Sequence, residues 1–434
     1  MRRFRSKVLA AFLTGALLIP TACIQAPVAM ADSSANKTIT LWHIQTTSPM
    51  PSIIADSATR FEKANPGYHV KITVMQNDAF KTKLQIAMSS NTMPDIFPTW
   101  TGGPMYQYID SKKLADLTSY MNKDNYKNMF MTGAISQATY KDKIWAVPVE
   151  NVSVAMFFYN KLVFAKYNLK VPKTQAQLES ICSTLKSKNV IPFSLANKTQ
   201  WTGSMYYMYL VDRVGGSKAF ANAVSGKGNG SFTDSTFEKA GAIIQKWVKA
   251  GYFNPGYNGL DEDSGQSRTL LYQGKAAMTL MGSWFISTVE GENKGFIKNI
   301  GSFPFPSVTG GKGDPNAVVG TVGDNFYAIA SSCKDVPAAF KVCQFMIDKT
   351  AQKKRIAAGH IPPLKATKVT DKLAQVVLDA VKKAPTVQLW YDQYLPSSLS
   401  SEYLNDNQAV FGLTKTPAQA DTAIAAAIKK YYKK

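Results

Sequence analysis

Strand-like and helix-like patterns alternate between residues 38 and 98, and this alternation restricts the possible folds more than any other feature of the sequence. In the first strand Ile39 and Leu41 share one face, as the strand period of two requires. The first helix ends at Asn65-Pro66-Gly67, a helix-stop signal. The expected strands are 38–42, 70–74 and 94–98, and the expected helices are 53–64 and 79–89. This order predicts a mostly parallel sheet covered by helices.

The first 31 residues have the pattern of a removable export signal. Four basic residues near the start are followed by an almost wholly apolar run, residues 8–19. That run is too short to remain in a bilayer as a spanning helix. We therefore expect the mature protein to work outside the cytoplasm. Because ATP, NADH and genomic DNA are scarce there, we consider functions that need them less consistent with this sequence.

Two endings of this signal are open. Ala29-Met30-Ala31 fits the small-x-small site of an ordinary signal peptidase, which would remove residues 1–31. Cys23 follows Thr21-Ala22 and resembles a lipoprotein cysteine, although Pro20 stands where a leucine is usual. Cleavage there would remove residues 1–22 and leave a lipidated Cys23. Residues 24–37 would then form a flexible tether.

The size and charge of the chain favour an exported globular protein of two domains. About 400 mature residues exceed one ordinary hydrophobic core. The export segment carries +4 of the net charge of +21, which leaves +17 on the mature chain. The basic residues are spread along the sequence, whereas a nucleic-acid-binding protein more often concentrates them on one face. We expect attraction to an anionic cell envelope and no nucleic-acid partner.

The sequence predicts no metal and no cofactor. Its three histidines have no short spacing, which argues against a zinc site, and its glycine-rich turns lack the phosphate-binding loop pattern. Cys333 and Cys343 could pair, but their spacing does not settle the geometry. Cys182 lies in an expected helix. With three cysteines in the mature chain, this is not a disulfide scaffold, and the hydrophobic core must hold the fold.

Five segments in a fixed order cover nearly the whole mature chain. The segments are Asn77-Asp78-Ala79-Phe80-Lys81-Thr82-Lys83-Leu84 with Met93-Pro94-Asp95-Ile96-Phe97, Trp145-Ala146-Val147-Pro148 with Phe157-Phe158-Tyr159-Asn160-Lys161, Gln273-Gly274-Lys275-Ala276-Ala277-Met278 with Gly282-Ser283-Trp284, Gly323-Asp324 with Phe326-Tyr327-Ala328-Ile329-Ala330, and Ile361-Pro362-Pro363-Leu364. No single segment is specific, but together they resemble the extracellular solute-binding protein family of ABC importers, in its oligosaccharide-binding branch.

The resemblance implies two α/β lobes, a hinge of crossing strands, and a ligand cleft between the lobes. We expect residues 38–150 and 305–355 in the first lobe, and residues 151–304 and 356–434 in the second. The resemblance also implies a binding protein rather than an enzyme. It would be monomeric, sit on the outer face of the cytoplasmic membrane, and deliver an oligosaccharide to a membrane permease.

Aromatic residues in loops are candidates for stacking on sugar rings, because their planes pack against C–H faces with little loss of rotamer entropy. Trp100 follows a predicted parallel strand, whose end is a usual ligand position. The resemblance also favours Trp201, Trp284 and one of the pair Trp390 and Tyr391, of which we prefer Tyr391. The remaining tryptophans lie within regular elements, where a core position is expected: Trp42, Trp145 and Trp247.

Acids and amides near these loops suit the hydroxyl groups of a sugar, because an ionised acceptor makes a stronger hydrogen bond. Asn77 and Asp78 precede a predicted helix and are also candidate N-caps. Glu150 lies between two strands near the expected hinge, where its charge needs a partner. The full set of polar candidates is His43, Gln45, Asn77, Asp78, Glu150, Asn151, Asp324 and Asp392.

Two other functions stay open at this point. An exported glycoside hydrolase would use two carboxylates across the scissile bond. Glu150, Asp324 and Asp392 are candidates, although 29 acids supply such pairs by chance. An envelope adhesin would instead use the net positive charge.

Overall fold

The computed structural model describes residues 37–432. The predicted signal segment, Cys23 and residues 24–36 of the predicted tether lie outside the described residues. Among the helices of residues 37–432, none combines the length and apolar character needed to cross a bilayer.

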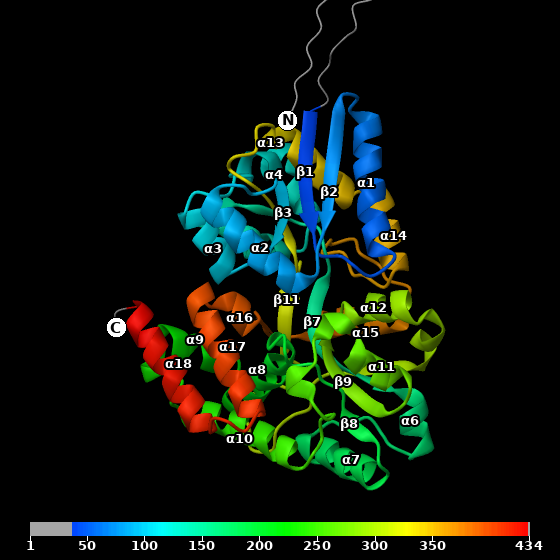
Figure 1. The fold of residues 1–434 in the computed structure, drawn as a ribbon, viewed down its shortest axis with the longest axis vertical. Helices are drawn as coiled ribbons and strands as arrows, with labels where there is room; N and C mark the ends of the chain where they lie inside the picture. Colours follow the sequence, from blue (N-terminus) through cyan, green and yellow to red (C-terminus); the bar gives the residue numbers. More distant parts are fainter. Residues whose placement is uncertain (1–36, 433–434) are drawn as a thin grey trace, which may run out of the picture. The chain divides into compact units, whose positions relative to one another are not determined.

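The first sheet is built on the predicted alternation of strands and helices (Figure 1). β1 pairs in parallel with β2 on one side and with β3 on the other. Ile39 and Leu41 of β1 are buried, as their shared face predicts. In order across the sheet, the strands are β2 (Tyr68–Val74), β1 (Lys37–His43), β3 (Ile96–Thr99), β12 (Phe326–Ile329) and β6 (Ala146–Pro148).

Helices cover this sheet, and α1 lies against α13 and α14, which come from a much later part of the chain. The predicted caps of α2 are wrong. Asn77 and Asp78 lie inside its first turn, Gln76 occupies the N-cap, and its side chain makes no capping bond. The helices here are α1 (Met50–Ala64), α2 (Asn77–Ser90), α3 (Gly103–Asp110), α4 (Thr118–Asn122), α5 (Thr132–Ala138), α13 (Val336–Met346) and α14 (Lys349–Ala357), with the hairpin β4 (Thr139–Tyr140) and β5 (Lys143–Ile144).

The second sheet has β7 at its centre, with antiparallel neighbours on both sides. The nine-residue run of β7 is buried except for Tyr159, as its continuous apolar character predicts. β10 also pairs with β7. The strands are β13 (Val387–Gln388), β11 (Val318–Val322), β7 (Val152–Asn160), β9 (Ala276–Gly282) and β8 (Ile191–Phe193), with β10 (Ile300–Phe303) beside β7.

Capping motifs place several helices of this second part. Thr174 and Gln177 form the predicted capping box of α7. Thr416 and Gln419 make the same reciprocal bonds at the start of the final helix. The helices are α6 (Lys161–Lys166), α7 (Gln175–Ser187), α8 (Trp201–Gly215), α9 (Ala219–Ser225), α10 (Ser235–Lys249), α11 (Gln266–Tyr272), α12 (Phe285–Glu292), α15 (Lys372–Lys383), α16 (Tyr391–Tyr394), α17 (Ser397–Phe411) and α18 (Pro417–Tyr432).

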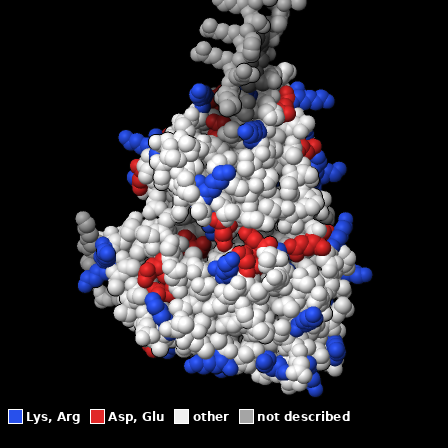
Figure 2. All heavy atoms as spheres, in the orientation of Figure 1, with Lys and Arg blue, Asp and Glu red and all other residues white. Residues whose placement is uncertain are grey.

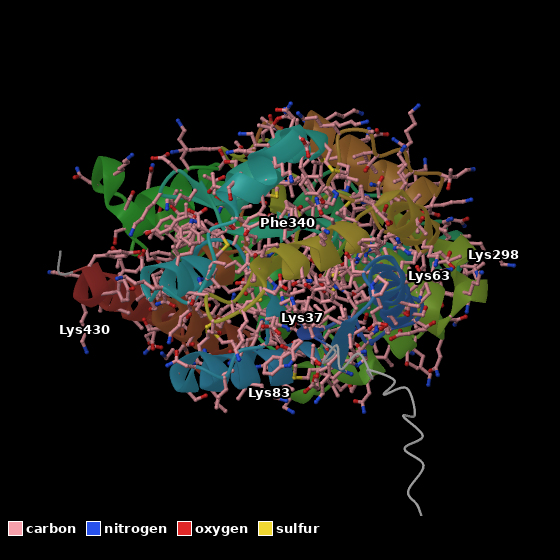
Figure 3. All side chains as sticks on the ribbon, turned by 90° about the horizontal axis from the view of Figure 1, so that it is seen from above. Lys37, Lys63, Lys83, Lys298, Phe340 and Lys430 are labelled. Atoms are coloured by element: carbon pink, nitrogen blue, oxygen red, sulfur yellow. The ribbon has the colours of Figure 1, made fainter. Side chains whose placement is uncertain are left out.

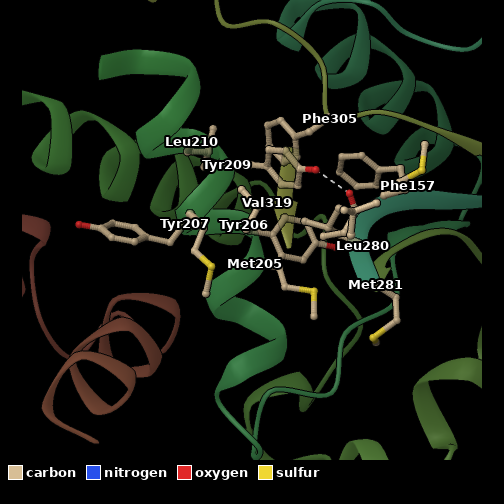
Figure 4. Close-up of a cluster of buried hydrophobic side chains, with 14 of the residues drawn as sticks. Phe157, Met205, Tyr206, Tyr207, Tyr209, Leu210, Leu280, Met281, Phe305 and Val319 are labelled. Carbon is tan, nitrogen blue, oxygen red and sulfur yellow. Dashed lines mark hydrogen bonds between the residues drawn. The ribbon is translucent and has the colours of Figure 1, made fainter. Parts of the chain in front are cut away.

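The second hydrophobic core forms around α8. Figure 4 shows Tyr206 and Tyr209 of this helix directed toward Phe157 and Phe305. Tyr209 stacks on Phe305 with ring centroids 4.8 Å apart, and its hydroxyl donates to the Ala155 carbonyl at 2.6 Å. This bond satisfies a phenol that would otherwise be costly to bury. The core therefore holds α8 firmly against β7.

Each sheet mixes parallel and antiparallel pairs, so the sheets are less parallel than the alternation alone suggests. The antiparallel pairs arise where the chain crosses between sheets. β6 leads to β7 through residues 149–151, and β11 leads to β12 through residues 323–325. Val318 and Val319 belong to the same core as Phe157. Residues 305–322 therefore lie with the second sheet, and the chain returns to the first sheet at 323–325 rather than at 305.

The described cysteines are not bonded to one another. Cys182, Cys333 and Cys343 are all free thiols. Burial raises the pKa of Cys333 to about 12, so its thiol is protonated at neutral pH.

Candidate functional site

A cleft of about 320 Å³ lies where the elements of the two sheets face each other. On one side it meets the loops that follow the carboxyl ends of β1, β2 and β3, the usual ligand position of a parallel sheet. On the other side are α8, α11, α12 and α16. The crossing residues Asp324 and Asn325 line it between these two walls. Its volume suits a ligand of a few sugar rings or similar size.

Four tryptophans from distant parts of the sequence line the cleft. Trp284 contacts Trp201 and Trp390, with ring centroids 5.9 and 6.0 Å apart and interplanar angles near 60°. Trp100 lies on the other wall, and the ammonium group of Lys81 sits 4.9 Å from its ring centroid. Both walls thus present indole rings to the cleft.

The position of Trp284 depends on a glycine. An added Cβ at Gly282 would lie 2.0 Å from Cζ3 of Trp284, so any larger residue would displace the indole. Gly282 ends β9, and Trp284 immediately precedes α12. The Gly-Ser-Trp segment therefore folds the ring back over its own strand.

Beside the tryptophans, both cleft walls contain flexible apolar side chains. Met205 and Met208 come from α8, Met281 from β9, and Met50 from the start of α1. Thioether side chains adapt their shape to a neighbour at small cost. The methionine side chains can therefore follow the contour of a ligand more closely than branched side chains could.

Three residues that line the cleft have a buried polar atom without a hydrogen-bond partner within residues 37–432. The atoms are Nε1 of Trp201, Oδ1 of Asn325 and Oε1 of Gln393. A buried polar atom without a hydrogen bond costs about 1–3 kcal/mol, so a bound polar ligand would offset this cost. These atoms point to a ligand rich in hydroxyl or amino groups.

One end of the cleft is organised by Arg268. Its guanidinium donates to Glu292 through Nε at 3.0 Å and Nη2 at 2.6 Å, and Nη1 donates to Glu262. Ser267 and Tyr272 donate to the same two carboxylates, at 3.0 and 2.8 Å. This network is rigid, because each carboxylate accepts from at least two donors.

Burial raises the pKa of the other carboxyl groups of the cleft. The pKa of Asp324 rises to about 7 because the group is desolvated. Burial likewise raises the pKa of Asp392 and of Asp263. Ser153 and Lys81 oppose the rise for Asp324, Arg268 and Lys81 oppose it for Asp263, and Lys81 opposes it for Asp392, in each case only in part. The ionised form of these acids is thus disfavoured until a further donor or positive charge enters the cleft.

The cleft brings together seven of the residues that the sequence predicts for the site. They come from the ends of β1, β2 and β3, from α8, from the β9–α12 turn, from the 323–325 crossing and from α16. They are Gln45, Asn77, Trp100, Trp201, Trp284, Asp324 and Asp392.

Glu150, Asn151 and His43 do not line the cleft, and their predicted sugar contacts are wrong. The charge of Glu150 finds its partner in the interior, where Arg355 donates to it at 2.6 Å. Asn151 accepts from the Ile361 backbone at 2.6 Å. His43 is buried at the end of β1 and accepts from the backbone of Gln45 at 3.2 Å.

The preference for Tyr391 over Trp390 as the ligand-facing residue is also wrong. Trp390 lines the cleft, whereas Tyr391 stacks on Phe220 with ring centroids 3.5 Å apart. The two side chains of neighbouring residues at the start of α16 diverge, so only one can reach the ligand. Asp78 does not line the cleft either. Its carboxylate accepts a hydrogen bond from the side chain of Asn77, which does line it, at 2.8 Å.

The four methionines of the cleft, Lys81 and the network around Arg268 were not identified as site residues from the sequence. The four methionines occupy helix and strand positions that resemble ordinary core. No periodic pattern marks Arg268, because its partners Glu262 and Glu292 lie 6 and 24 residues away. Lys81 had a usable signal, since it lies one helical turn after Asn77 and Asp78.

Fold and cleft together define a class: α/β binding proteins that hold a small ligand between two domains. The model of the family described as bacterial extracellular solute-binding protein matches residues 44–353. The chain belongs to this family, whose members bind solutes and are not enzymes.

Relatives and solved structures agree with this assignment. An uncharacterized ABC transporter extracellular-binding protein of Pyrococcus horikoshii, PH1214, is 27% identical over 321 residues, 70% of each chain. A multiple sugar-binding protein of Streptococcus mutans is 25% identical over 338 residues, 75% of this chain and 74% of its own. A structure from work on xylan utilization by Caldanaerobius polysaccharolyticus has a TM-score of 0.84 and 29% identity, covering 90% of this chain and all of its own.

Proposed function

We propose that this protein is the substrate-binding component of an ABC importer and captures an oligosaccharide in its cleft. The observation that carries this proposal is the placement of Trp100, Trp201, Trp284 and Trp390 on opposed walls of one cleft. Indole planes match the C–H faces of sugar rings, and the sugar-binding name of the Streptococcus mutans relative supports this ligand class.

The polar groups of the cleft complement the rims of such rings. Asp324 and Asp392 accept from sugar hydroxyls, and Gln45 and Asn77 can donate or accept. The unpartnered Nε1 of Trp201 would donate to a hydroxyl or ring oxygen. Asn325 and Gln393 would accept through their free amide oxygens. A ligand bound this way touches both walls.

Contact with both walls gives the ligand a means of closing the cleft. We place the hinge at the crossings 149–151 and 323–325, with the first lobe around the first sheet and the second lobe around the second. A ligand favours the closed state by its greater affinity for it. The closed form would then dock on a membrane permease. A lipid on Cys23 would keep the protein beside that permease.

The hydrolase alternative loses one of its candidate acids. Glu150 is 1% exposed and bound to Arg355, so it cannot reach a scissile bond in the cleft. Asp324 and Asp392 remain at the surface of the cleft, where hydroxyl binding accounts for them.

The test is a panel of xylan-, chitin-, starch- and raffinose-type oligosaccharides, screened by thermal shift and then by calorimetry. A true ligand stabilises the protein in proportion to the logarithm of its concentration. Chromatography of the incubated sugars should show no shortened products. W284A should abolish the shift, and W145A should retain it, because Trp145 lies outside the cleft and donates to the Tyr140 carbonyl instead.

Release of shortened sugars would overturn the proposal in favour of the hydrolase. Absence of a saturable shift with any carbohydrate would overturn the oligosaccharide ligand. Small-angle scattering with and without the selected sugar tests closure, and an unchanged radius of gyration would contradict it.

A further inference from the structure

The charge of the cleft is opposite to that of the chain. The sequence has 50 basic and 29 acidic residues. Figure 2 shows acidic side chains gathered in a band across the middle of the visible face. Lysines such as Lys298 and Lys430 extend outward at opposite edges of the molecule (Figure 3). The residues that line the cleft include five acids and two bases: Glu262, Asp263, Glu292, Asp324 and Asp392 against Lys81 and Arg268.

The two bases do not balance these acids. Arg268 is fully engaged by Glu262 and Glu292, and the three groups carry one net negative charge. Within residues 37–432, Asp263, Asp324 and Asp392 have no ion pair. Lys81 lies 4.0 Å from Asp78, so its charge is already shared with a fourth carboxylate outside the lining. The cleft therefore retains an excess of negative charge.

Burial makes this excess costly. It raises the pKa of Asp78, Asp263, Asp324 and Asp392, and Lys81 together with neighbouring groups such as Ser153 and Arg268 offsets this rise only in part. Asp324 is 8% exposed, and the side-chain oxygen of the next residue, Asn325, has no hydrogen-bond partner within residues 37–432. A donor that carries positive charge would satisfy both groups and favour the ionised carboxylates.

Lys81 shows how this cleft accommodates an ammonium group. Its Nζ lies over the Trp100 ring, 4.9 Å from the centroid, and beside the Asp78 carboxylate. Indole faces attract cations, and a neighbouring carboxylate adds to the attraction. The opposite wall offers the same pair of groups, the indoles of Trp201, Trp284 and Trp390 and the carboxylates of Asp263 and Asp392, without an ammonium of its own. Asp324 adds a carboxylate between the two walls.

We infer that the cleft selects oligosaccharides whose sugars carry protonated amino groups over neutral sugars of the same size. This inference rests on the proposed function and names the substrate class of the same site. Residues 37–432 contain no group of three or more carboxyl, thiol or imidazole side chains placed to hold a metal ion. Indole rings beside single carboxylates suit an organic ammonium group instead.

The test compares two ligands that differ in acetylation of the amine, which removes its positive charge and adds an acetyl group. Glucosamine oligosaccharides and their fully N-acetylated counterparts of equal length are titrated calorimetrically into the full mature protein, at a pH where the free amines are protonated. The amine form should bind about tenfold or more tightly, as expected for one charge-assisted contact. Raising the salt concentration should weaken the amine form and leave the acetylated form unchanged.

Matched variants locate the effect. D392N and D263N keep the size of each side chain and remove its charge, so each should reduce the preference for the amine about tenfold. D142N is the control, because Asp142 is exposed and lies outside the cleft, and it should leave the preference unchanged. Circular dichroism and thermal unfolding show whether each variant is folded.

The failures of this inference and of the proposed function are distinguishable. Equal or tighter binding of the acetylated form, or of another neutral oligosaccharide, overturns the inference and leaves the proposed function standing. A preference for the amine that persists in D392N and D263N and at raised salt concentration also overturns the inference and leaves the proposed function standing. Absence of binding by every amino and neutral oligosaccharide overturns both.

Discussion

Arg355 and Glu150 form an ion pair in the interior of the protein, with 2.6 Å between Nη1 and Oε2 and both side chains 1% exposed. Tyr327 donates to the same carboxylate at 3.2 Å, and Nε of Arg355 donates to the Met346 carbonyl at 3.1 Å. Glu150 sits in the 149–151 crossing, and Arg355 comes from α14. The pair therefore ties the crossing strands to a helix of the first lobe.

Removal of one partner should be strongly destabilising. R355M leaves the Glu150 carboxylate buried without its cation, and such a loss costs about 3–5 kcal/mol. Urea unfolding of wild type and R355M measures the difference directly. K143M is the control, because the pair of Lys143 with Asp116 is exposed and contributes about 0–1 kcal/mol. Equal stability of R355M and K143M would contradict the structural role of the buried pair.

Two histidines beside this pair should make stability depend on pH. Burial lowers the pKa of His43 and His360 to about 4, from an ordinary value of 6.5, although Glu150 opposes the change. Between these values the unfolded chain binds protons that the folded chain does not. The stability that each histidine contributes is therefore fully present above pH 6.5. It falls by about 3 kcal/mol as the pH drops toward 4.

The variant H360Q isolates this effect. Asp324 and Asp421, whose pKa values rise to about 7, act in the opposite sense, so only a difference between variants is informative. Between neutral pH and pH 4, wild type should lose about 3 kcal/mol more than H360Q does. H69Q should follow wild type, because His69 is exposed. Parallel pH curves for wild type and H360Q would show that His360 does not titrate as described.

How far the sequence predicts this molecule depends on the range of the interactions. The strand and helix alternation up to residue 99 and the capping boxes at Thr174 and Thr416 arise from neighbours in sequence, and the structure confirms them. The partner of Glu150 lies 205 residues away, so the sequence suggests that a partner must exist and cannot name it.

In the cleft, too, local features are predictable from the sequence and features set by long-range packing are not. A loop tryptophan after a parallel strand is recognisable locally, and Trp100 lines the cleft as expected. Whether Trp390 or Tyr391 faces the ligand depends on Phe220, which lies about 170 residues earlier and receives the tyrosine ring. Local pattern identifies the aromatic pair, and tertiary packing decides between its members.

That decision can be tested with two conservative substitutions. W390F shortens a ring that lines the cleft and contacts Trp284, so it should weaken binding of the selected oligosaccharide about fivefold, as for the loss of about 1 kcal/mol of aromatic contact. Y391F keeps the stacked ring and should leave affinity within about twofold. Calorimetry gives both values, and a larger loss for Y391F than for W390F would reverse the assignment.

The cleft should also be sensitive to a single added methyl group behind Trp284. In G282A the new Cβ would lie 2.0 Å from Cζ3 of Trp284, and the indole cannot shift freely because Trp201 and Trp390 contact it. Such overpacking costs about 1–3 kcal/mol, so we expect a displaced ring and at least about tenfold weaker binding. G295A is the matched control, since nothing lies within 4 Å of an added Cβ there. Calorimetry and tryptophan fluorescence measure affinity and ring environment. Unchanged affinity in G282A would mean that the position of Trp284 does not determine ligand binding.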